Sequence, residues 1–231
     1  MGTHLLTGAG SGIGAALADR LHARGDSLVL VARSVERAGV LAGRYPGAST
    51  LVVDLVAPGL VPDPLGPLPE RLDSVIHCAG VVELAPVAEL DLVSLSSQLN
   101  VNLVSPMVLT RQLVPAVRRA RGLHLFVNSS AGLTASASWS AYAASKFGLR
   151  AFADSLRAEE TEHGVRVSTV YPSRTATPMQ EKVHQQEGRT YDASRWISVD
   201  TVADTILHVL DLPADATIPE VVVRPVVPRS V

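Results

Sequence analysis

Short apolar runs alternate with longer amphipathic stretches along most of this chain. The apolar runs have the length of buried strands and consist mainly of Val, Leu and Ile. The stretches between them repeat apolar residues at helical spacing, and Ile13, Leu17 and Leu21 share one face of the first. We predict strands at residues 4–7, 27–32, 50–53, 74–78, 123–128, 165–171 and 220–224. We predict helices at residues 12–24, from a Ser34 cap to residues 43–46, at 90–119 with an interruption near Pro106, at 141–163 and at 199–210.

The alternation of strands and helices predicts an α/β fold. Strands that are apolar at successive positions are covered on both faces, which is typical of a parallel sheet between two helical layers. Residues 58–69 contain five prolines and are expected to form a loop in place of a crossover helix. Residues 177–196 are polar and irregular, and we interpret 178–196 as a lid that contains a short helix. No repeat or linker divides residues 1–231, so we expect a single domain.

Composition and charge exclude several classes of protein. With 47% hydrophobic and 18% charged residues, the chain has the balance of a globular protein. Its formal charge of −2 gives no basic surface for nucleic acid or an anionic membrane. The densest basic cluster is Arg118, Arg119 and Arg121. We interpret this cluster as the cationic end of a helix, with a phosphate-binding patch as the alternative.

The single cysteine and the start of the chain bear on location. Cys78 cannot form an internal disulfide, and its apolar neighbours indicate a core residue rather than a nucleophile. The first predicted strand begins almost at Met1, which leaves no room for a signal peptide. We find no apolar stretch long enough to span a membrane. We therefore expect a cytoplasmic protein without nucleic-acid or membrane partners, and we assign no metal ligands.

A glycine-rich turn joins the first predicted strand to the first predicted helix. Its residues are Thr7, Gly8, Ala9, Gly10, Ser11, Gly12, Ile13 and Gly14. Glycine lets the backbone turn tightly and approach a pyrophosphate, to which the helix N-terminus offers N–H groups and a positive dipole end. Because the turn opens a strand–helix–strand unit, we predict that its residues 8 and 10–14 bind a dinucleotide. The alternative is a tight turn that binds no ligand.

The residues after the second and third strands indicate which dinucleotide binds. An NAD site usually has an acidic residue after the second strand, which binds the ribose hydroxyls of the adenosine. Arg33 and Ser34 stand there instead, and Arg33 can bind a 2′-phosphate, helped by the Ser34 hydroxyl. We therefore favour NADP(H) over NAD(H); the alternative for Arg33 is an ordinary surface residue. Asp54 and Leu55 follow the third strand, and Asp54 can accept a hydrogen bond from the adenine amino group.

Tyr142 and Lys146 stand four residues apart and share one face of a predicted helix. The chain has two lysines against eighteen arginines, so a lysine at 146 indicates a need for a compact charge. We expect this ammonium to lower the pKa of the Tyr142 phenol from about 10. Ser129 ends the fifth strand, where its hydroxyl can hold a substrate carbonyl oxygen beside that of Tyr142. We predict that Tyr142 gives its proton to this oxygen as hydride reaches the carbonyl carbon.

Three features occur together here: a TGxxxGIG turn at residues 7–14, a YxASK-like motif at residues 142–146, and Ser129 thirteen residues before Tyr142. In this combination the chain resembles the short-chain dehydrogenase/reductase family, in its compact single-domain form. The resemblance implies a Rossmann-type doubly wound sheet of about seven mostly parallel strands, with helices on both faces, and a carbonyl or alcohol as substrate. It implies that Asn102 anchors a water that relays protons to Lys146. It further implies cofactor contacts by Ala79, Gly80, Tyr142, Lys146, Pro172, Thr175 and Thr177.

Two positions depart from the pattern of that family. Its Asn-Asn pair after the fourth strand is His77 and Cys78 here, which puts in doubt the contacts that the asparagines make at the centre of the sheet. Its Pro-Gly after the sixth strand is Pro172 and Ser173, so a side chain is added near the nicotinamide. None of the four catalytic positions is altered, and we expect an active enzyme.

The sequence says less about the substrate and the oligomeric state than about the reaction. Residues 212–225 look like the tail of NADP-dependent 3-hydroxy acid dehydrogenases, which points to a small polar hydroxy acid or ketone. In the lid, Lys182 or Arg189 can bind a carboxylate, although a surface role is the default. The family associates through two long helices, so we expect a homodimer or homotetramer. The alternative functions are a non-catalytic NADP(H)-sensing regulator on the same fold and an epimerase or dehydratase, whose members normally carry a larger C-terminal domain.

Overall fold

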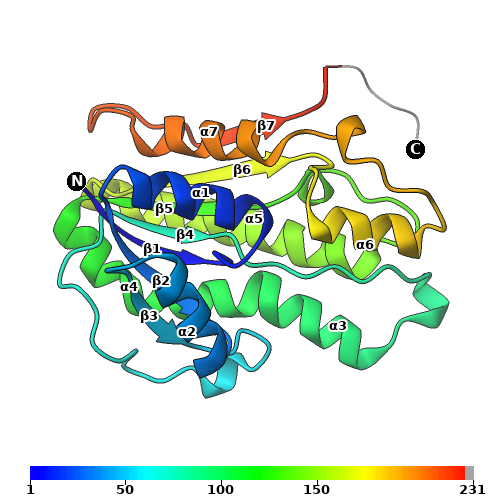
Figure 1. Cartoon of the computed structure of the whole chain (residues 1–231), viewed down its shortest axis with the longest axis horizontal. Coiled ribbons are helices and arrows are strands. Elements are labelled where there is room, and N and C mark those ends of the chain that lie inside the picture. The colour runs from blue at the N-terminus through cyan, green and yellow to red at the C-terminus, as the bar shows by residue number, and fades with distance from the viewer. Residues whose placement is uncertain (227–231) are drawn as a thin grey trace.

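Seven parallel strands form one sheet in the order β3-β2-β1-β4-β5-β6-β7 (Figure 1). The structure is a computed structural model that describes residues 1–226. The strands are β1 Thr3–Thr7, β2 Ser27–Ala32, β3 Ser49–Val52, β4 Ser74–His77, β5 Leu123–Val127, β6 Arg166–Pro172 and β7 Glu220–Val223. Each predicted strand is present with its ends within one residue of the prediction. The predicted doubly wound α/β fold is confirmed, and every strand pair in the described sheet is parallel.

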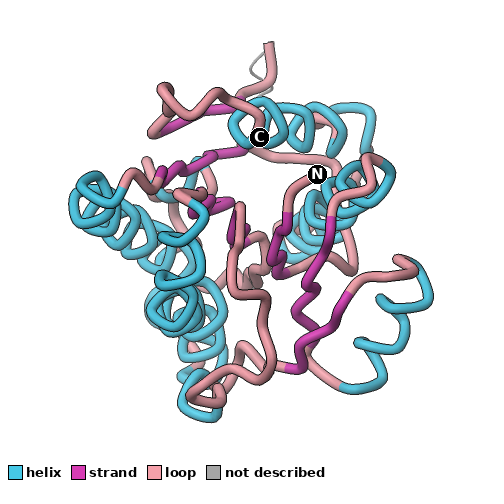
Figure 2. The backbone as a smooth tube through the Cα atoms, turned by 90° about the vertical axis from the view of Figure 1, so that its left-hand side faces the viewer, coloured by secondary structure: helices cyan, strands magenta, loops and turns pink. Residues whose placement is uncertain are grey.

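Helices cover both faces of the sheet (Figure 2). They are α1 Gly12–Ala23, α2 Val35–Arg44, α3 Leu92–Leu99, α4 Ser105–Ala120, α5 Ser140–Glu160, α6 Pro178–Gln186 and α7 Val199–Leu210. Neighbouring strand residues point to opposite faces, so Leu6 packs with α1, α2 and α7, whereas Leu5 packs with α4. Both leucines are fully buried, and burial of each contributes roughly 1.5–3 kcal/mol. The continuous apolar runs are thus explained by the two helical layers.

The long helical region between β4 and β5 is interrupted, but not as a simple proline break. A π-helical turn at Asn100–Val104 joins α3 to α4, and the Ser105 N–H donates to the Asn100 carbonyl. Pro106 follows and has no N–H, so it cannot donate to the carbonyl of Asn102 four residues earlier. The side chain of Asn102 is buried in this turn. A wide turn of this kind often marks a functional position in a helix.

The expectation that no apolar stretch is long enough to span a membrane is wrong for the region between β4 and β5. The helical run Leu92–Ala120, of 29 residues, is long and apolar enough to cross a membrane by length and composition. Its inner side packs on the sheet through Leu109, Leu113 and Val117, which are fully buried. Only 33% of its most apolar stretch is buried, so apolar side chains also remain on its outer side. We interpret the run as a core helix of this α/β domain whose outer side carries both apolar residues, such as Met107, and charged ones, such as Arg111 and Arg118.

The two predicted irregular regions have the expected character. Within residues 58–69 the structure has one short 3₁₀ turn, Pro58–Leu60, and otherwise loop. Residues 177–196 contain α6 and a 3₁₀ turn at Ala193–Arg195. Because all seven strands run in one direction, their carboxyl ends meet at one edge of the sheet, and α6 lies at this edge beside the turn after β6.

Candidate active site

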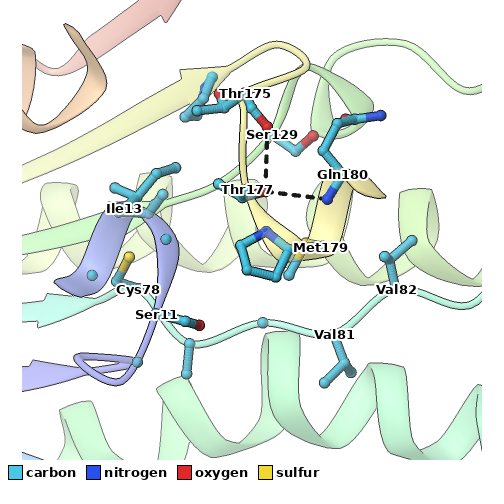
Figure 3. A pocket seen from close by; sticks show the side chains of 18 of the residues that line it. Ser11, Ile13, Cys78, Val81, Val82, Ser129, Thr175, Thr177, Met179 and Gln180 are labelled. Carbon is cyan, nitrogen blue, oxygen red and sulfur yellow. Dashed lines mark hydrogen bonds between the residues drawn. The ribbon is translucent and has the colours of Figure 1, made fainter. Parts of the chain in front are cut away.

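A cavity of ≈ 1070 Å³ follows the carboxyl edge of the sheet. The predicted site residues that line it are Gly8, Gly10, Ser11, Gly12, Ile13, Gly14, Arg33, Asp54, Leu55, Ala79, Gly80, Ser129, Tyr142, Lys146, Pro172, Thr175 and Thr177. Figure 3 shows Ser11 and Ile13 of the glycine turn, Val81 and Val82 after β4, and Thr177, Met179 and Gln180 of α6 around the same space. Of the predicted residues, Ser34 and Asn102 do not line it. One cavity therefore joins the predicted cofactor site to the predicted catalytic residues.

The geometry of the glycine turn explains its composition. A Cβ on Gly14 would lie 2.2 Å from the Gly8 carbonyl oxygen, so the start of α1 packs directly on the turn. Gly8 has a φ of +78°, and a Cβ there would lie 2.8 Å from the backbone nitrogen of Ala79. Gly10 is different, because the nearest atom to a Cβ there would be a guanidinium nitrogen of Arg37 at 3.8 Å. The turn is thus closed on its inner side and open to the cavity at Gly10.

The turn after β4 is tied to the glycine turn by Thr7. Its hydroxyl oxygen accepts hydrogen bonds from the backbone N–H groups of Cys78 and Ala79, both at 3.0 Å. Cys78 lines the cavity, and burial raises the pKa of its thiol to about 12, with a smaller opposing effect of Lys146. The thiol therefore keeps its proton at neutral pH. The predicted core position is met only in part, because Cys78 is partly buried against the core and lines the cavity.

His77 replaces the asparagine contacts at the centre of the sheet with different ones. Its Nε2 lies 3.0 Å from the Thr110 hydroxyl of α4, and its ring stacks on Phe126 of β5 with centroids 4.9 Å apart. Burial, with a smaller effect of the charge of His124, lowers the pKa of His77 to about 3. A neutral imidazole at this position thus joins β4 to β5 and to α4.

Arg33, just after β2, and Arg37, in the first turn of α2, both line the cavity, whereas the sequence predicted Arg33 alone. Arg33 is exposed and lines the cavity. The Ser34 hydroxyl oxygen accepts a hydrogen bond from the Arg37 N–H at 3.3 Å and caps α2. Because this bond leaves the O–H of Ser34 able to donate, its predicted assisting role stays a prediction. Arg37 lines the cavity beside Gly10 and was missed. The sequence could have indicated Arg37, because it lies three residues after the Ser34 cap, in the first turn of α2, and therefore near the edge of the cavity.

Asp54 lies at the same end of the cavity, as predicted. One of its carboxylate oxygens accepts a hydrogen bond from the Val56 N–H at 3.0 Å, which fixes the turn after β3. The adjacent Leu55 also lines the cavity, and its carbonyl accepts a hydrogen bond from the Ser105 hydroxyl at 2.7 Å. The turn after β3 is thereby tied to the start of α4.

Ser129, Tyr142 and Lys146 meet at the other end of the cavity. Tyr142 and Lys146 lie one turn apart on α5, with the lysine Nζ 5.8 Å from the centroid of the tyrosine ring. The ammonium donates a hydrogen bond to the Val127 carbonyl at 3.1 Å. Ser129 follows β5, and its hydroxyl oxygen accepts a hydrogen bond from the Ala131 N–H at 3.1 Å. The three predicted groups are therefore brought together by the end of β5 and the first turns of α5.

The expected lowering of the Tyr142 pKa is not found. Burial raises the pKa of this phenol to about 12, and a side-chain hydrogen bond with Ser129 opposes only part of the rise. Burial also lowers the pKa of Lys146 to about 8, with Cys78 acting in the opposite direction. Burial is the physical reason for the difference, and the lysine hydrogen bond goes to a backbone carbonyl rather than to the phenol. At neutral pH Tyr142 keeps its proton.

Asn102 does not line the cavity, but its side chain bonds residues that stand next to the catalytic groups. Its side-chain nitrogen donates hydrogen bonds to the Val81 carbonyl at 2.9 Å and to the Ser145 hydroxyl at 3.0 Å. Its side-chain oxygen accepts a hydrogen bond from the Val81 N–H at 2.8 Å. The amide thus holds the segment after β4 against α5, next to Lys146. Pro106 cannot donate an α-helical hydrogen bond to the backbone carbonyl of Asn102, which lies in the π-helical turn.

The cavity continues beyond Tyr142 to residues that were not predicted. Trp139 lies beside Tyr142, with ring centroids 5.7 Å apart, and Arg174 follows the turn after β6. Neither Lys182 nor Arg189 lines the cavity, and Lys182 forms an exposed ion pair with Glu83 at 2.6 Å. The default surface role that we gave these two cations thus agrees with the structure.

Comparison with known proteins identifies the family. The sequence profile described as short chain dehydrogenase matches residues 3–188. The chain belongs to the short-chain dehydrogenase family. D-threitol dehydrogenase of Mycolicibacterium smegmatis is 33% identical to this short-chain dehydrogenase over 187 residues, which cover 77% of this chain and 72% of that protein. L-xylulose reductase of Bos taurus is 29% identical over 216 residues, with 89% and 87% covered.

A solved structure of a dehydrogenase has the same fold as this protein. A putative short chain dehydrogenase from Escherichia coli CFT073, complexed with NADPH, has a TM-score of 0.83 and 25% sequence identity. The similarity covers 96% of both chains. The family resemblance and the fold predicted from the sequence are thus confirmed, and the protein is an oxidoreductase of this family.

Proposed function

We propose that this short-chain dehydrogenase is an NADP(H)-dependent enzyme that interconverts a carbonyl and an alcohol. The observation that carries the proposal is the single cavity that runs from the glycine turn and two arginines to Ser129, Tyr142 and Lys146. The names of the two relatives support it, since one is the dehydrogenase of an alcohol, D-threitol, and the other is the reductase of a ketose, L-xylulose. The NADPH bound to the Escherichia coli protein supports the choice of cofactor.

The residues at the glycine turn fit a dinucleotide that carries a 2′-phosphate. The open side of Gly10 and the N-terminus of α1 suit a pyrophosphate. We assign the phosphate on the ribose to Arg33 and Arg37 and the adenine amino group to Asp54, which is supported by the position of all three residues in the lining of the cavity. When bound, the nicotinamide gives or accepts the hydride. No acidic residue stands between β2 and α2, which argues against NAD(H).

The protein's own groups handle the proton. A phenol with a raised pKa is protonated at neutral pH, so Tyr142 is ready to donate to a carbonyl oxygen in the reductive direction. The Ser129 hydroxyl orients that oxygen, and the Lys146 ammonium favours the phenolate that remains. A water held at Asn102, as the family resemblance implies, would return the proton to Tyr142 by way of Lys146. In the oxidative direction the raised pKa makes a higher pH favourable.

The arginines provide a test of cofactor choice. We expect Arg33→Ala and Arg37→Ala each to weaken NADPH binding by about 1–3 kcal/mol, the range for a charge-assisted hydrogen bond, and to leave NADH binding largely unchanged. Fluorescence titration of both cofactors measures the change. Arg44→Ala is the matched control, because this nearby guanidinium already bonds Asp19. Equal losses for NADPH and NADH would remove the arginine concerned from the 2′-phosphate site.

We also propose that residues 178–196 act as a lid on one undivided domain. The start of this segment lies against the glycine turn, where a Cβ on Gly12 would be 3.2 Å from a Thr177 methyl carbon. The Met179 methyl group reaches the turn after β4, at 3.7 Å from a Cβ on Gly80. A cytoplasmic location remains a prediction, which the distribution of a fluorescently tagged protein would test.

Assembly into a dimer or tetramer remains a prediction that the exposed apolar residues support. Met107 on α4 and Phe147 on α5 are 40% and 41% exposed, on the two helices through which we expect copies to associate. Light scattering at micromolar concentration should give the mass of a dimer or tetramer, and Phe147→Asp should reduce it. A stable monomer of the unaltered protein would contradict the prediction.

A further inference from the structure

Arg174 and Glu187 form a partly buried ion pair at the substrate end of the cavity. The guanidinium donates to both carboxylate oxygens, at 2.9 and 2.6 Å. The two side chains are 17% and 15% exposed, and both residues line the cavity. Arg174 comes from the turn after β6, whereas Glu187 caps the end of α6. The pair therefore spans from the body of the domain to the proposed lid.

Two tryptophans frame this arginine. The Arg174 guanidinium carbon lies 5.7 Å from the centroid of the Trp139 ring and 5.5 Å from that of Trp196. They are the two tryptophans of the whole chain. Trp139 also contacts Tyr142, so a single indole separates the guanidinium from the proposed proton donor. A substrate whose carbonyl reaches Tyr142 would extend along this indole toward Arg174.

A planar guanidinium with two parallel donors is the group that binds a substrate carboxylate best. Glu187 already accepts a hydrogen bond from each of the two terminal nitrogens of Arg174. Burial, the largest single effect, raises the pKa of Glu187, but the bonds to Arg174 together with the charges of Arg174, Arg189 and His184 outweigh it. The pKa is lowered on balance, so the glutamate is charged at neutral pH. The pair is therefore neutral as a unit. A substrate carboxylate entering here would have to displace Glu187 and leave it as a partly buried, unpaired charge.

The other cationic residues that line the cavity do not offer a carboxylate-binding group near Tyr142. Among the described residues that line it, Arg33, Arg37 and Arg44 belong to the glycine-turn end, and Lys146 bonds the Val127 carbonyl. Arg224 is exposed after β7. Around the pair the lining includes Val82, Trp139 and Val183, which pack together as an apolar cluster with Tyr142.

From these contacts we propose that the Arg174–Glu187 pair sets the charge class of the substrate. Glu187 fills the carboxylate site of Arg174, and the enzyme accepts a carbonyl compound or alcohol whose remaining part is uncharged and apolar or aromatic. The inference rests on the proposed function, and it departs from the small polar hydroxy acid indicated by the tail of the sequence. Replacing Glu187 with a neutral residue should expose the guanidinium and admit anionic substrates.

Tryptophan fluorescence tests this inference without turnover, because both tryptophans of the chain lie on Arg174. Benzoate and its neutral analogue benzamide are the probes. We expect Glu187→Gln to bind benzoate about tenfold or more tightly than the unaltered protein, with benzamide binding little changed. The double variant Arg174→Gln/Glu187→Gln should lose that gain. Equal benzoate affinity in the unaltered protein and Glu187→Gln, or no response of Glu187→Gln to benzoate, would overturn the proposal.

Glu83→Gln is the matched control for loosening of the lid. It removes the same charge from a carboxylate that holds α6 through Lys182 and Gln186, and Glu83 does not line the cavity. We expect no gain in benzoate affinity from it. The same gain as in Glu187→Gln would attribute the effect to lid mobility and overturn the proposal. Benzoate binding by the unaltered protein that Arg224→Ala abolishes would overturn it too, in favour of Arg224.

Turnover separates this inference from the proposed function. With NADPH, the unaltered enzyme should reduce methyl benzoylformate faster than benzoylformate, and Glu187→Gln should raise kcat/KM for the acid by about tenfold or more. If no carbonyl compound is reduced while the fluorescence results stand, the proposed function fails and the charge selection at Arg174 survives. If the ester is reduced and the acid is preferred by the unaltered enzyme, the inference fails and the proposed function survives.

Discussion

Replacing Tyr142 with Phe is expected to lower kcat by about 10²–10⁴-fold, the usual contribution of a positioned acid–base group. The phenol is buried in the cavity beside Ser129 and keeps its proton at neutral pH, so its hydroxyl is the acid that the reductive step requires. The substitution removes one oxygen and retains the ring that packs on Trp139. NADPH affinity should therefore stay nearly unchanged. Steady-state kinetics and a cofactor titration measure the two quantities.

Tyr45→Phe is the matched control for that experiment. Tyr45 is as buried as Tyr142, but its hydroxyl donates to Asp19 at 2.9 Å, outside the cavity. This variant should keep the kcat of the unaltered enzyme, with at most a small loss of stability from the missing hydrogen bond. Persistence of turnover in Tyr142→Phe would mean that another group donates the proton. A parallel loss of NADPH binding would instead indicate a disturbed cavity.

Replacing Gly14 with Ala is expected to destroy the cofactor site and weaken the fold. The added Cβ would lie 2.2 Å from the Gly8 carbonyl oxygen, and this obstacle is backbone rather than a flexible side chain. The start of α1 must move away from the turn, which displaces the N–H groups proposed to hold the pyrophosphate. We expect a loss of about 1–3 kcal/mol in the free energy of unfolding, and no measurable NADPH binding. Urea unfolding and fluorescence titration provide the measurements.

Gly39→Ala separates this local effect from the general effect of the substitution. Gly39 lies within α2, and a Cβ there would meet no atom within 4 Å. Alanine favours a helix over glycine, so this variant should gain about 0.5–1 kcal/mol and bind NADPH normally. If Gly14→Ala binds NADPH as well as Gly39→Ala does, the turn does not carry the cofactor as proposed.

Much of the fold and the core of the site could be predicted because the signals are local. Val, Leu and Ile at successive positions require cover on both sides, which led to the parallel sheet. The spacing from Tyr142 to Lys146 is one helical turn, and Ser129 ends a strand whose carboxyl end points to the same edge. Position relative to the strand ends was therefore enough to bring these residues into one cavity.

The features that were missed depend on contacts between distant segments. The pKa of Tyr142 depends on how deeply its phenol is buried and on its hydrogen bond with Ser129, neither of which sequence spacing reveals. The Arg174–Glu187 pair joins a turn to the far end of α6, and its importance comes from the two tryptophans around it. The length and apolar character of the helical run Leu92–Ala120 were overlooked, because polar residues separate its apolar residues in the sequence.

The measurement that tests the central claim most directly is a fluorescence titration of the purified protein with NADPH and with NADH. The proposed site predicts binding of both through the glycine turn, with a clear preference for NADPH because Arg33 and Arg37 stand where an acidic residue would select NADH. A preference for NADH would contradict the assignment of the arginines while leaving an oxidoreductase of this family. Failure to bind either cofactor would contradict the proposed function itself.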